Sequence, residues 1–424
     1  MNVHATWFQR MAQMPARRLL LWILLFAVLT RLVTALLLGN TVSGLSGAHD
    51  EISYDMLGQR FATGHGMTFP SAWYPWIEAD APQSYYSFTI SFFLAMIYGL
   101  FGHYPVVARL IMAAMSVMIV FMVYLLAKRL FDENVALLAS AICAGYAYLI
   151  FYGVTLVTET PFTLALMIAI YLCLNIRDAA HDTVWQWIGL GLVLAVAVLL
   201  RMAVIFFVPV LLIWLITSMP RPRPLTRVLI PVLIIVLAVL PFTIRNYSLW
   251  GHFSLLETQF GHVFWNGNHP GHNGVYHPSY VFPIPQEVLA SKNDVIITNT
   301  LLKMGIANVL ADPQHFLLLT VGRLREFFTF WPTADSSLLA NVLRVVSFGV
   351  ILPFAVAGMV MNLRRFRDLA PIYLFVVIHT GIYAVTWTMI RYRTPLDPFF
   401  IMFAAYALIG LYIRVTSTDN RGAA

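Results

Sequence analysis

Long apolar runs separated by short polar segments dominate the sequence. The first run extends from Leu19 to Leu38, and comparable runs occupy residues 105–127, 134–152, 156–176, 185–200, 203–218, 226–243, 338–362, 370–389 and 395–414. A helix of about 20 apolar residues crosses a hydrocarbon core of roughly 30 Å. The first run exceeds the roughly 7–15 apolar residues of a signal peptide, so we interpret it as a retained span. The pattern predicts an all-α polytopic membrane protein, with residues 1–424 as a single membrane domain.

Basic residues set the expected orientation of these helices. They cluster at residues 10–18, at Lys128/Arg129, at Arg177, at Arg221/Arg223/Arg227, at Arg364/Arg365/Arg367 and at Arg414/Arg421. The positive-inside rule places such clusters in the cytoplasm, which requires an even number of crossings between neighbouring clusters. The remaining run, 85–101, is short and rich in aromatic residues, so we interpret it as an interfacial or re-entrant helix. This threading gives about ten transmembrane helices, with both termini in the cytoplasm.

Composition agrees with a membrane protein and narrows its chemistry. Sixty per cent of the residues are hydrophobic and 11% are charged, whereas soluble domains are near a quarter charged. The net charge of +7 is explained by the basic loops, so we expect no nucleic-acid partner. Cys143 and Cys173 both fall inside apolar runs and are typical of small core residues.

Two long segments, 41–104 and 245–337, lie on the non-cytoplasmic side in this threading, as a first periplasmic loop with interfacial helices and an acidic motif and as a large periplasmic loop. Loops longer than about 15 residues are uncommon unless they are functional or disordered. These two are rich in Trp, Tyr, Gly and Pro. Most of the carboxylates also fall on this side, although they played no part in setting the orientation. We therefore expect the chemistry there.

The stretch GAHDEISYDMLGQRFATGHG, residues 47–66, follows the first span directly. As a helix from Asp50 to Phe61 it places Glu51 and Asp55 one turn apart. One interpretation is an amphipathic surface helix whose acidic first turn suits the helix dipole. The other is that Asp50 projects into a cavity as a general base or metal ligand. Asp55 is interpreted as a surface carboxylate.

Glu159 begins a span in the segment TLVTETPFTLAL. A carboxylate at a helix N-terminus is favoured by the dipole alone. An ionisable residue at the mouth of a helical bundle is also a functional candidate, and the pattern leaves both interpretations open.

Four arginines lie on the outer side, against the positive-inside trend: Arg201, Arg245, Arg391 and Arg393. A single one would be an ordinary snorkelling anchor. Four together favour a non-cytoplasmic anion site, because guanidinium groups match phosphate oxygens in bidentate geometry. The histidines between His252 and His277 lack the spacing of a zinc motif.

In order along the chain, these features resemble the GT-C superfamily of glycosyltransferases that use polyprenyl-phosphate sugars, and most closely the bacterial relatives of protein O-mannosyltransferases and of the aminoarabinose transferase of lipid A. The residues that carry the resemblance are His49-Asp50-Glu51, Gly64-x-Gly66, Phe101-Gly102, Ala108-Arg109-Leu110, Thr158-Glu159-Thr160, Arg201, Ile244-Arg245-Asn246-Tyr247 with Gly251, and Arg391-Tyr392-Arg393-Thr394-Pro395.

The resemblance implies a bacterial inner-membrane enzyme that moves a monosaccharide from a polyprenyl-phosphate donor to a lipid, glycan or protein acceptor on the periplasmic face, with inversion. It implies Asp50 as the base, with Glu51 and Glu159 in support. The arginines would bind the donor phosphate: Arg201, Arg245, Arg391 and Arg393. Membrane lipids would be the other partners. The sequence identifies no certain cofactor, and a divalent metal ion stays an open option, with Asp50, Glu159 and His262 as candidate ligands.

Two alternatives use the same residues differently. A transporter or flippase of a lipid-linked sugar would need the arginines for headgroup binding only. It should also carry ionisable groups near the midplane, where only Arg31 and His379 are candidates. A non-catalytic membrane scaffold would need no one-sided set of carboxylates and arginines.

Overall fold

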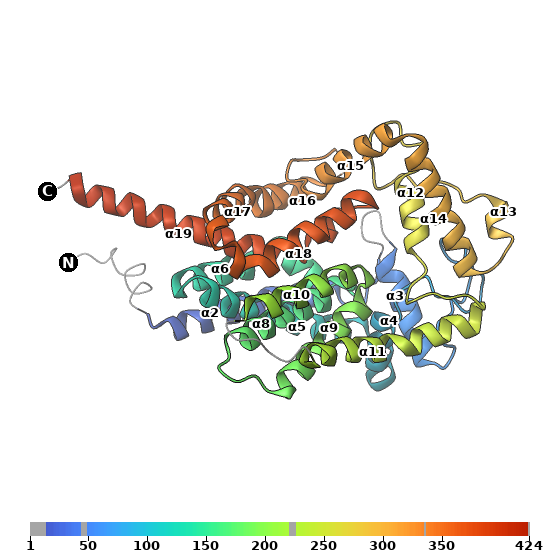
Figure 1. The fold of residues 1–424 in the computed structure, drawn as a ribbon, viewed down its shortest axis with the longest axis horizontal. Coiled ribbons are helices and arrows are strands. Elements are labelled where there is room, and N and C mark those ends of the chain that lie inside the picture. The colour runs from blue at the N-terminus through green and yellow to red at the C-terminus, as the bar shows by residue number, and fades with distance from the viewer. Residues whose placement is uncertain (1–13, 44–48, 220–225, 335, 423–424) are drawn as a thin grey trace.

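The computed structural model describes residues 14–43, 49–219, 226–334 and 336–422, and these residues fold mainly into helices, with long non-helical connections at 63–87 and 268–285. Within them, strand-like pairing is confined to one isolated bridge between Trp73 and Ile77. The molecule is elongated, and α2 begins near the end of the long axis toward which α19 runs (Figure 1). The predicted all-α membrane architecture is confirmed.

Eight helical segments among the described residues are long and apolar enough to cross a membrane. They are α2 (Ala16–Leu38), α5 (Pro105–Leu130), α8 (Glu159–Asp178), α11 (Thr226–Trp250), α14 (Asp294–Ala311), Leu338–Met361 formed by α16, η3 and α17, Leu363–Val385 formed by η4 and α18, and α19 (Asp397–Gly422) up to Val415. A ninth candidate is the pair formed by α6 (Glu133–Gly145) and Ala147–Val154, which is bent by 64°.

The count of ten crossings stays a prediction. Two of the expected spans correspond to shorter apolar helices, α9 (Val184–Leu200) and the segment Met202–Ser218 formed by η2 and α10 (Phe207–Ser218). In addition, α14 lies in the segment that was expected to be a loop. It packs against the short helices α12 (Phe260–Gly267) and α13 (Gln286–Leu289) at the end of the molecule away from α2 and α19 (Figure 1).

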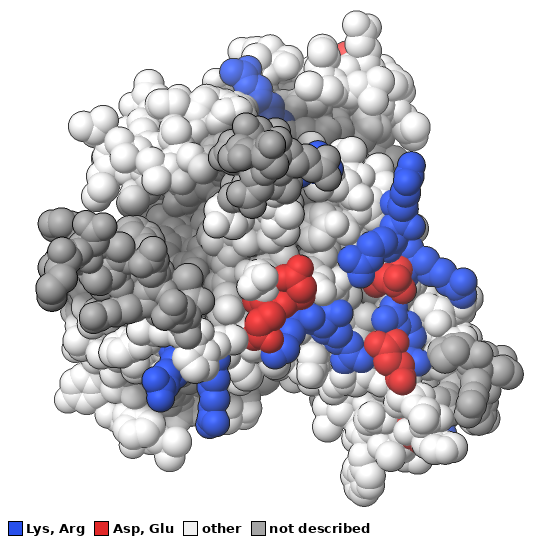
Figure 2. All heavy atoms as spheres, turned by 90° about the vertical axis from the view of Figure 1, so that its left-hand side faces the viewer, with Lys and Arg blue, Asp and Glu red and all other residues white. Residues whose placement is uncertain are grey.

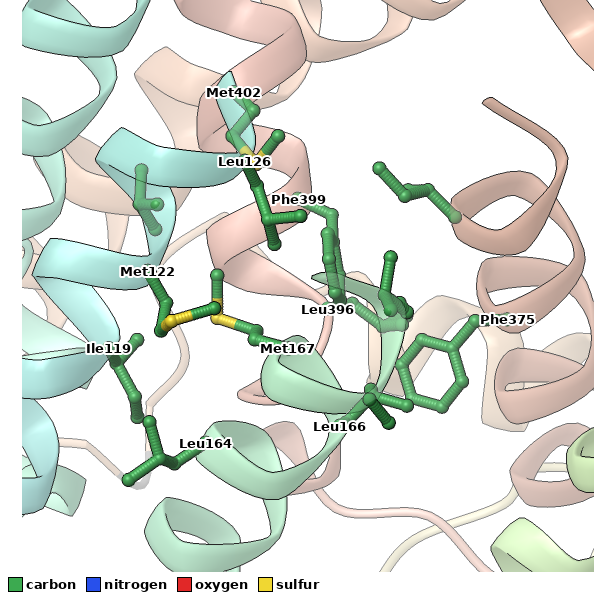
Figure 3. Close-up of a cluster of buried hydrophobic side chains, with 14 of the residues drawn as sticks. Ile119, Met122, Leu126, Leu164, Leu166, Met167, Phe375, Leu396, Phe399 and Met402 are labelled. Carbon is green, nitrogen blue, oxygen red and sulfur yellow. The ribbon is translucent and has the colours of Figure 1, made fainter. Parts of the chain in front are cut away.

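The main core lies where α5, α8, α18 (Phe366–Val385) and α19 meet (Figure 3). Met122 and Leu126 of α5 are buried beside Met167 of α8, with Phe375 and Phe399 closing the cluster. These helices are apolar around most of their circumference, as expected for helices buried within a bundle. The core holds in place the ends of α8 and α18 that lie opposite Asp178 and Asp368. These are called the outer ends below, and they carry the candidate site.

Basic clusters that are far apart in the sequence meet at one end of the molecule, the end that carries the start of α2 and the end of α19 (Figure 2). Arg129 contacts Asp178 at 2.8 Å, and Arg177 contacts Asp368 at 3.3 Å. Arg365 donates to the carbonyl of Leu130. The described clusters therefore share one side, as the positive-inside threading requires. Arg10, Arg221, Arg223 and the side chain of Arg421 lie outside the described residues.

The helix predicted over residues 50–61 is present as α3 (Asp50–Ala62), and it packs against α4 (Phe88–Phe101). The expectation that Asp55 is a surface carboxylate is wrong. Asp55 is buried, and it accepts hydrogen bonds from Tyr98 at 2.5 Å and from His103 at 3.0 Å. These two hydrogen bonds join α3 to the end of α4. They also supply the partners that a buried carboxylate requires.

Arg31 faces the bundle interior and is fully buried. It donates hydrogen bonds to the carbonyls of Cys143 and Ala144, at the kink between α6 and α7 (Ala147–Phe151), and to the hydroxyl of Ser116. These acceptors satisfy the guanidinium within the protein, which gives Arg31 a structural role in joining α2 to α5 and α6.

Candidate active site

A cavity of about 140 Å³ lies at the outer ends of α8, α9 and α18, beneath the first turn of α3. It gathers four of the residues singled out from the sequence: Asp50, Glu159, Arg201 and Arg391. They come from four separate segments, so the cavity exists only in the folded chain. The chain therefore concentrates two carboxylates and two guanidinium groups in one partly enclosed space.

Asp50 opens α3, where its charge is favoured by the helix dipole. About a third of its side chain is exposed, and one carboxylate oxygen is in contact with Arg391. The carboxylate therefore faces the cavity and remains accessible to a ligand there.

Glu159 is the first residue of α8 and its side chain is 1% exposed. Its Oε1 lies 2.7 Å from Nη2 of Arg201 and 3.7 Å from Nε of Arg391. A buried carboxylate requires paired charges, and the two arginines supply them. Glu159 thereby fixes the distance between the two cations.

Arg201 follows α9, where the backbone becomes extended before η2 (Met202–Phe206). Besides Glu159, it donates to the hydroxyl of Tyr383 at 2.6 Å and to Thr158 at 3.2 Å. Three partners, two at the start of α8 and one in α18, hold the guanidinium at the cavity wall.

Arg391 lies in η5 (Ile390–Arg393), and only 5% of its side chain is exposed. Burial lowers the pKa of the Arg391 guanidinium, but the charges of Asp50 and Glu159 outweigh that effect and hold the pKa well above its ordinary value. Arg391 is therefore a permanent cation. It links the two carboxylates of the cavity.

Tyr392 was not singled out from the sequence, yet its ring contacts both cations. The guanidinium carbons of Arg391 and Arg201 are 5.2 and 5.3 Å from the ring centroid. The ring also stacks on Tyr383 with centroids 4.7 Å apart. Cation–π contacts of this kind keep two like charges close together. The only sequence signal was the position of Tyr392 inside the Arg-Tyr-Arg segment.

Glu257 is a second residue that sequence reasoning did not single out. It follows the outer end of α11 and lines the same cavity. Burial raises the pKa of Glu257 to about 7, the charge of Asp50 adds to the rise, and the charge of Arg201 opposes it. No spacing or motif in the sequence distinguishes it from the other outer carboxylates.

Glu51, next to Asp50, does not line the cavity. Its carboxylate is 3% exposed and lies 2.7 Å from Nη1 of Arg109, with the amide of Leu156 at 3.1 Å. Arg109 also donates to the carbonyls of Gly39, Thr41 and Val154. This network attaches the first turn of α3 to the start of α5, so Glu51 positions Asp50 through the backbone.

The other two arginines also lie apart from this cavity. Arg393 is fully buried, pairs with Asp397 at 3.0 Å and donates to the carbonyl of Phe327. Arg245 lines a neighbouring cavity and contacts neutral groups around Ser84. Their predicted role in binding the donor phosphate stays a prediction, and the geometry favours Arg201 and Arg391 for it.

The three candidate metal ligands do not assemble. His262 is buried behind the cavity, with Nδ1 2.8 Å from the hydroxyl of Tyr85, and burial lowers its pKa to about 4. Asp50 and Glu159 are each paired with arginine. Among the described residues, no group of three or more His, Cys, Asp or Glu side chains is arranged to hold a metal ion. The residues present do not fit a metal site.

Comparison with known proteins supports this picture at two levels. A family model of dolichyl-phosphate-mannose-protein mannosyltransferases matches residues 86–245, a segment that contains Glu159 and Arg201. No significant match was found among curated proteins.

The fold is shared with solved structures of the oligosaccharyltransferase of Archaeoglobus fulgidus. The apo form superposes with a TM-score of 0.58 at 14% identity, covering 95% of this chain and 51% of that chain. The Archaeoglobus fulgidus oligosaccharyltransferase AglB in complex with an inhibitory peptide and a dolichol-phosphate superposes with a TM-score of 0.55 at 14% identity, covering 95% of this chain and 52% of that chain. ArnT from Cupriavidus metallidurans bound to undecaprenyl phosphate superposes with a TM-score of 0.47 at 14% identity, covering 91% of this chain and 60% of that chain.

The chain thus spans about half the length of the oligosaccharyltransferase structures it matches. The chain shares its GT-C-like fold with the oligosaccharyltransferase structures, and the resemblance to GT-C glycosyltransferases expected from the sequence is confirmed by the family model over residues 86–245.

Proposed function

We propose that this protein is an inverting glycosyltransferase that moves a monosaccharide from a polyprenyl-phosphate donor to an acceptor hydroxyl on the non-cytoplasmic face of the membrane. One observation carries the proposal: Asp50 shares a cavity with Arg201 and Arg391. The cavity lies beneath the first turn of α3, and α3 is away from the end of the molecule that carries the basic clusters (Figure 1). A base and a phosphate-binding pair are the two groups that such a transfer requires.

Asp50 is the proposed base. The acceptor oxygen attacks the anomeric carbon, the bond from that carbon to the phosphate oxygen breaks, and its electron pair leaves with the polyprenyl phosphate. The acceptor proton passes to the carboxylate of Asp50. Because a single displacement occurs on the face opposite the leaving group, the configuration inverts. A carboxylate is a weak base toward an alcohol, so proton transfer accompanies an oxocarbenium-like transition state.

Arg391 and Arg201 are the proposed phosphate ligands. The phosphate leaving group needs its growing charge neutralised, and preorganised cations in a cavity do this effectively. In the structure Arg391 contacts Asp50. A donor phosphate would compete for that guanidinium and release the Asp50 carboxylate toward the acceptor. Donor binding would thus switch on the base.

Apolar residues beside the arginines are suited to the lipid. Leu200, Met202, Phe260 and Ile382 line the same cavity. Leu200, Met202 and Ile382 lie in or next to apolar runs that the sequence expects to be in the membrane, and Phe260 begins α12. The first isoprene units would pass over these side chains. This arrangement supports a lipid-linked donor over a soluble nucleotide sugar.

The test uses Asp50→Asn in protein reconstituted into lipid nanodiscs. A panel of undecaprenyl-phosphate sugars is supplied with a membrane extract as the acceptor source, and released undecaprenyl phosphate is measured. We expect Asp50→Asn to bind undecaprenyl phosphate at least as well as wild type and to lose about a hundredfold or more in turnover. Asp80→Asn is the matched control, because Asp80 is exposed and pairs with Arg60 on the surface.

Wild-type turnover by Asp50→Asn would remove Asp50 as the base. If wild-type protein moves a lipid-linked sugar across the bilayer without consuming it, the transporter alternative is correct instead.

A further inference from the structure

Arg245 is a cation without a contacting carboxylate. It lies near the outer end of α11 and donates to the carbonyl of Gln83 at 3.1 Å, to the hydroxyl of Ser84 at 3.3 Å and to the side-chain oxygen of Asn246 at 3.2 Å. All three acceptors are neutral. Within the described parts of the chain, no Asp or Glu oxygen lies within ion-pair distance of Arg245. Partly buried charges ordinarily require such a partner.

The carboxylate whose charge acts on Arg245 is Asp294, and it is already engaged. Both oxygens of Asp294 accept hydrogen bonds, one from Nε1 of Trp76 at 2.7 Å and the other from the amide of Ser84 at 2.8 Å. Ser84 therefore stands between Asp294 and Arg245. The charge of Asp294 acts on Arg245 from a distance and does not occupy its N–H groups.

A small cavity faces the Arg245 side chain. Its volume is about 30 Å³, and Gln83, Ser84, Asn246 and Glu257 supply its polar lining. That space holds roughly two water molecules, or one tetrahedral oxyanion in their place. The amide nitrogen of Gln83 is buried and has no hydrogen-bond partner among the described residues. Arg245 and Gln83 both line this space. It is therefore bordered by a guanidinium with no ion-paired carboxylate and by a residue whose side-chain nitrogen is unpaired among the described residues, and such donors suit an anion.

Glu257 connects this cavity to the cavity of about 140 Å³ that holds Asp50, Arg201 and Arg391, because it lines both. The larger one is called the reaction cavity below. Arg201 and Arg391 line only the reaction cavity, whereas Arg245 lines only the smaller one. A single molecule could therefore place a hydroxyl beside Asp50 and Glu257 and extend an anionic group toward Arg245.

We propose that the cavity around Arg245 is a second anion site, separate from the donor phosphate site, which binds a phosphate or carboxylate group of the acceptor. This inference rests on the proposed function, since it divides the arginines of the outer face between donor and acceptor. The acceptor class is an anionic hydroxyl compound, and its anionic group belongs either to a lipid headgroup or to a water-soluble molecule.

The experiment measures phosphate binding with the donor site filled. Wild-type protein in phosphatidylcholine nanodiscs is saturated with undecaprenyl phosphate, and inorganic phosphate is titrated at constant ionic strength while thermal unfolding is followed. A ligand that binds only the folded state raises the unfolding temperature. A parallel arm replaces inorganic phosphate with nanodiscs that contain phosphatidylglycerol. A response to phosphate alone identifies a soluble source, and a response to phosphatidylglycerol alone identifies a lipid headgroup.

Arg245→Gln should weaken the responding probe by about tenfold or more, as expected for loss of a charge-assisted contact. It should leave the affinity for undecaprenyl phosphate within about twofold. Arg391→Gln should show the reverse pattern. Gln83→Glu is a second variant that keeps the shape of the side chain, supplies Arg245 with a carboxylate and should abolish the response to the probe without loss of stability. Arg60→Gln, on the same face, should change neither affinity.

Three outcomes overturn the inference: no response to either probe in wild type, a probe response abolished by Arg391→Gln, or loss of undecaprenyl phosphate affinity in Arg245→Gln. The last result would show that Arg245 binds the donor phosphate, as predicted from the sequence. Failure of wild type to bind undecaprenyl phosphate would instead contradict the proposed function, and comparison of the phosphate titrations of Arg245→Gln and Arg391→Gln would still report on Arg245.

Discussion

Arg201 and Glu159 form an ion pair at the outer end of the bundle, with 2.7 Å between Nη2 and Oε1. Arg391 approaches the same oxygen at 3.7 Å. One carboxylate thus balances two cations that would otherwise repel each other. A phosphate group carries the same kind of charge, so Glu159 holds the arginines ready for a donor and is a competitor of that donor.

The first prediction concerns Glu159→Gln. Removing one partner of a buried ion pair costs about 3 kcal/mol, because the remaining charge is left uncompensated. We expect a corresponding loss of stability in chemical denaturation, and we expect undecaprenyl phosphate to stabilise the variant more than it stabilises wild type, since its phosphate replaces the lost charge.

Glu133→Gln is the control for that experiment. Glu133 pairs with Lys128 at the basic end, where both side chains are about a third or more exposed, so its loss should cost no more than about 1 kcal/mol. If undecaprenyl phosphate stabilises Glu159→Gln no more than wild type, the two arginines are not its binding site.

The second prediction separates Glu51 from its neighbour Asp50. Glu51→Gln should destabilise the protein by about 3 kcal/mol, because Arg109 then remains buried without its counter-charge. Affinity for undecaprenyl phosphate, measured at a temperature where the variant is folded, should match that of wild type. Glu78→Gln is the control, since Glu78 pairs with Lys292 at an exposed position. A stable Glu51→Gln that fails only in turnover would make Glu51 a member of the catalytic set.

Much of the architecture could be predicted from the sequence because membrane helices and basic clusters obey one-dimensional rules. The side on which Asp50, Glu159, Arg201 and Arg391 lie follows from apolar run lengths and from the positions of Lys and Arg. Those rules specify a side of the membrane. They do not specify which neighbour a side chain meets.

The residues whose contacts differ from those expected from the sequence show this limit. Arg391 and Arg393 share one short η5 turn, and residues two apart on a 3₁₀ helix point in different directions, so Arg391 reaches the cavity while Arg393 turns to Asp397. Glu51 meets Arg109 only after α5 has folded against α3. Such pairings depend on tertiary packing, which the residue pattern does not encode.

The third prediction concerns pH and Glu257. Burial raises its pKa in the folded protein from 4.5 to about 7, so the folded state binds more protons than the unfolded state between these values. Stability should therefore fall as pH rises through this window and level off above pH 7. Glu257→Gln removes this dependence.

The measurement is the difference in unfolding temperature between Glu257→Gln and wild type. The two proteins should agree below about pH 4.5, and the variant should be the more stable above about pH 7. Asp80→Asn, at an exposed site, should show no such pH-dependent gain in unfolding temperature over wild type. A constant difference at all pH values would show that Glu257 ionises normally in the folded protein.

The fourth prediction concerns the contact that seats α12 on α14. A Cβ atom added to Gly261 would lie 1.9 Å from the carbonyl oxygen of Thr298, a distance that the backbone of α14 cannot accept without moving. Gly261→Ala should therefore displace α12 and shift Phe260 and Val263, which line the reaction cavity. We expect a loss of about 2 kcal/mol in stability, as is typical of overpacking, together with weaker binding of undecaprenyl phosphate.

Gly99→Ala is the matched control, because Gly99 lies in α4 with no atom within 4 Å of the added Cβ, and it should be neutral or slightly stabilising. Equal behaviour of the two variants would show that the close approach of α12 to α14 is not required for the shape of the cavity.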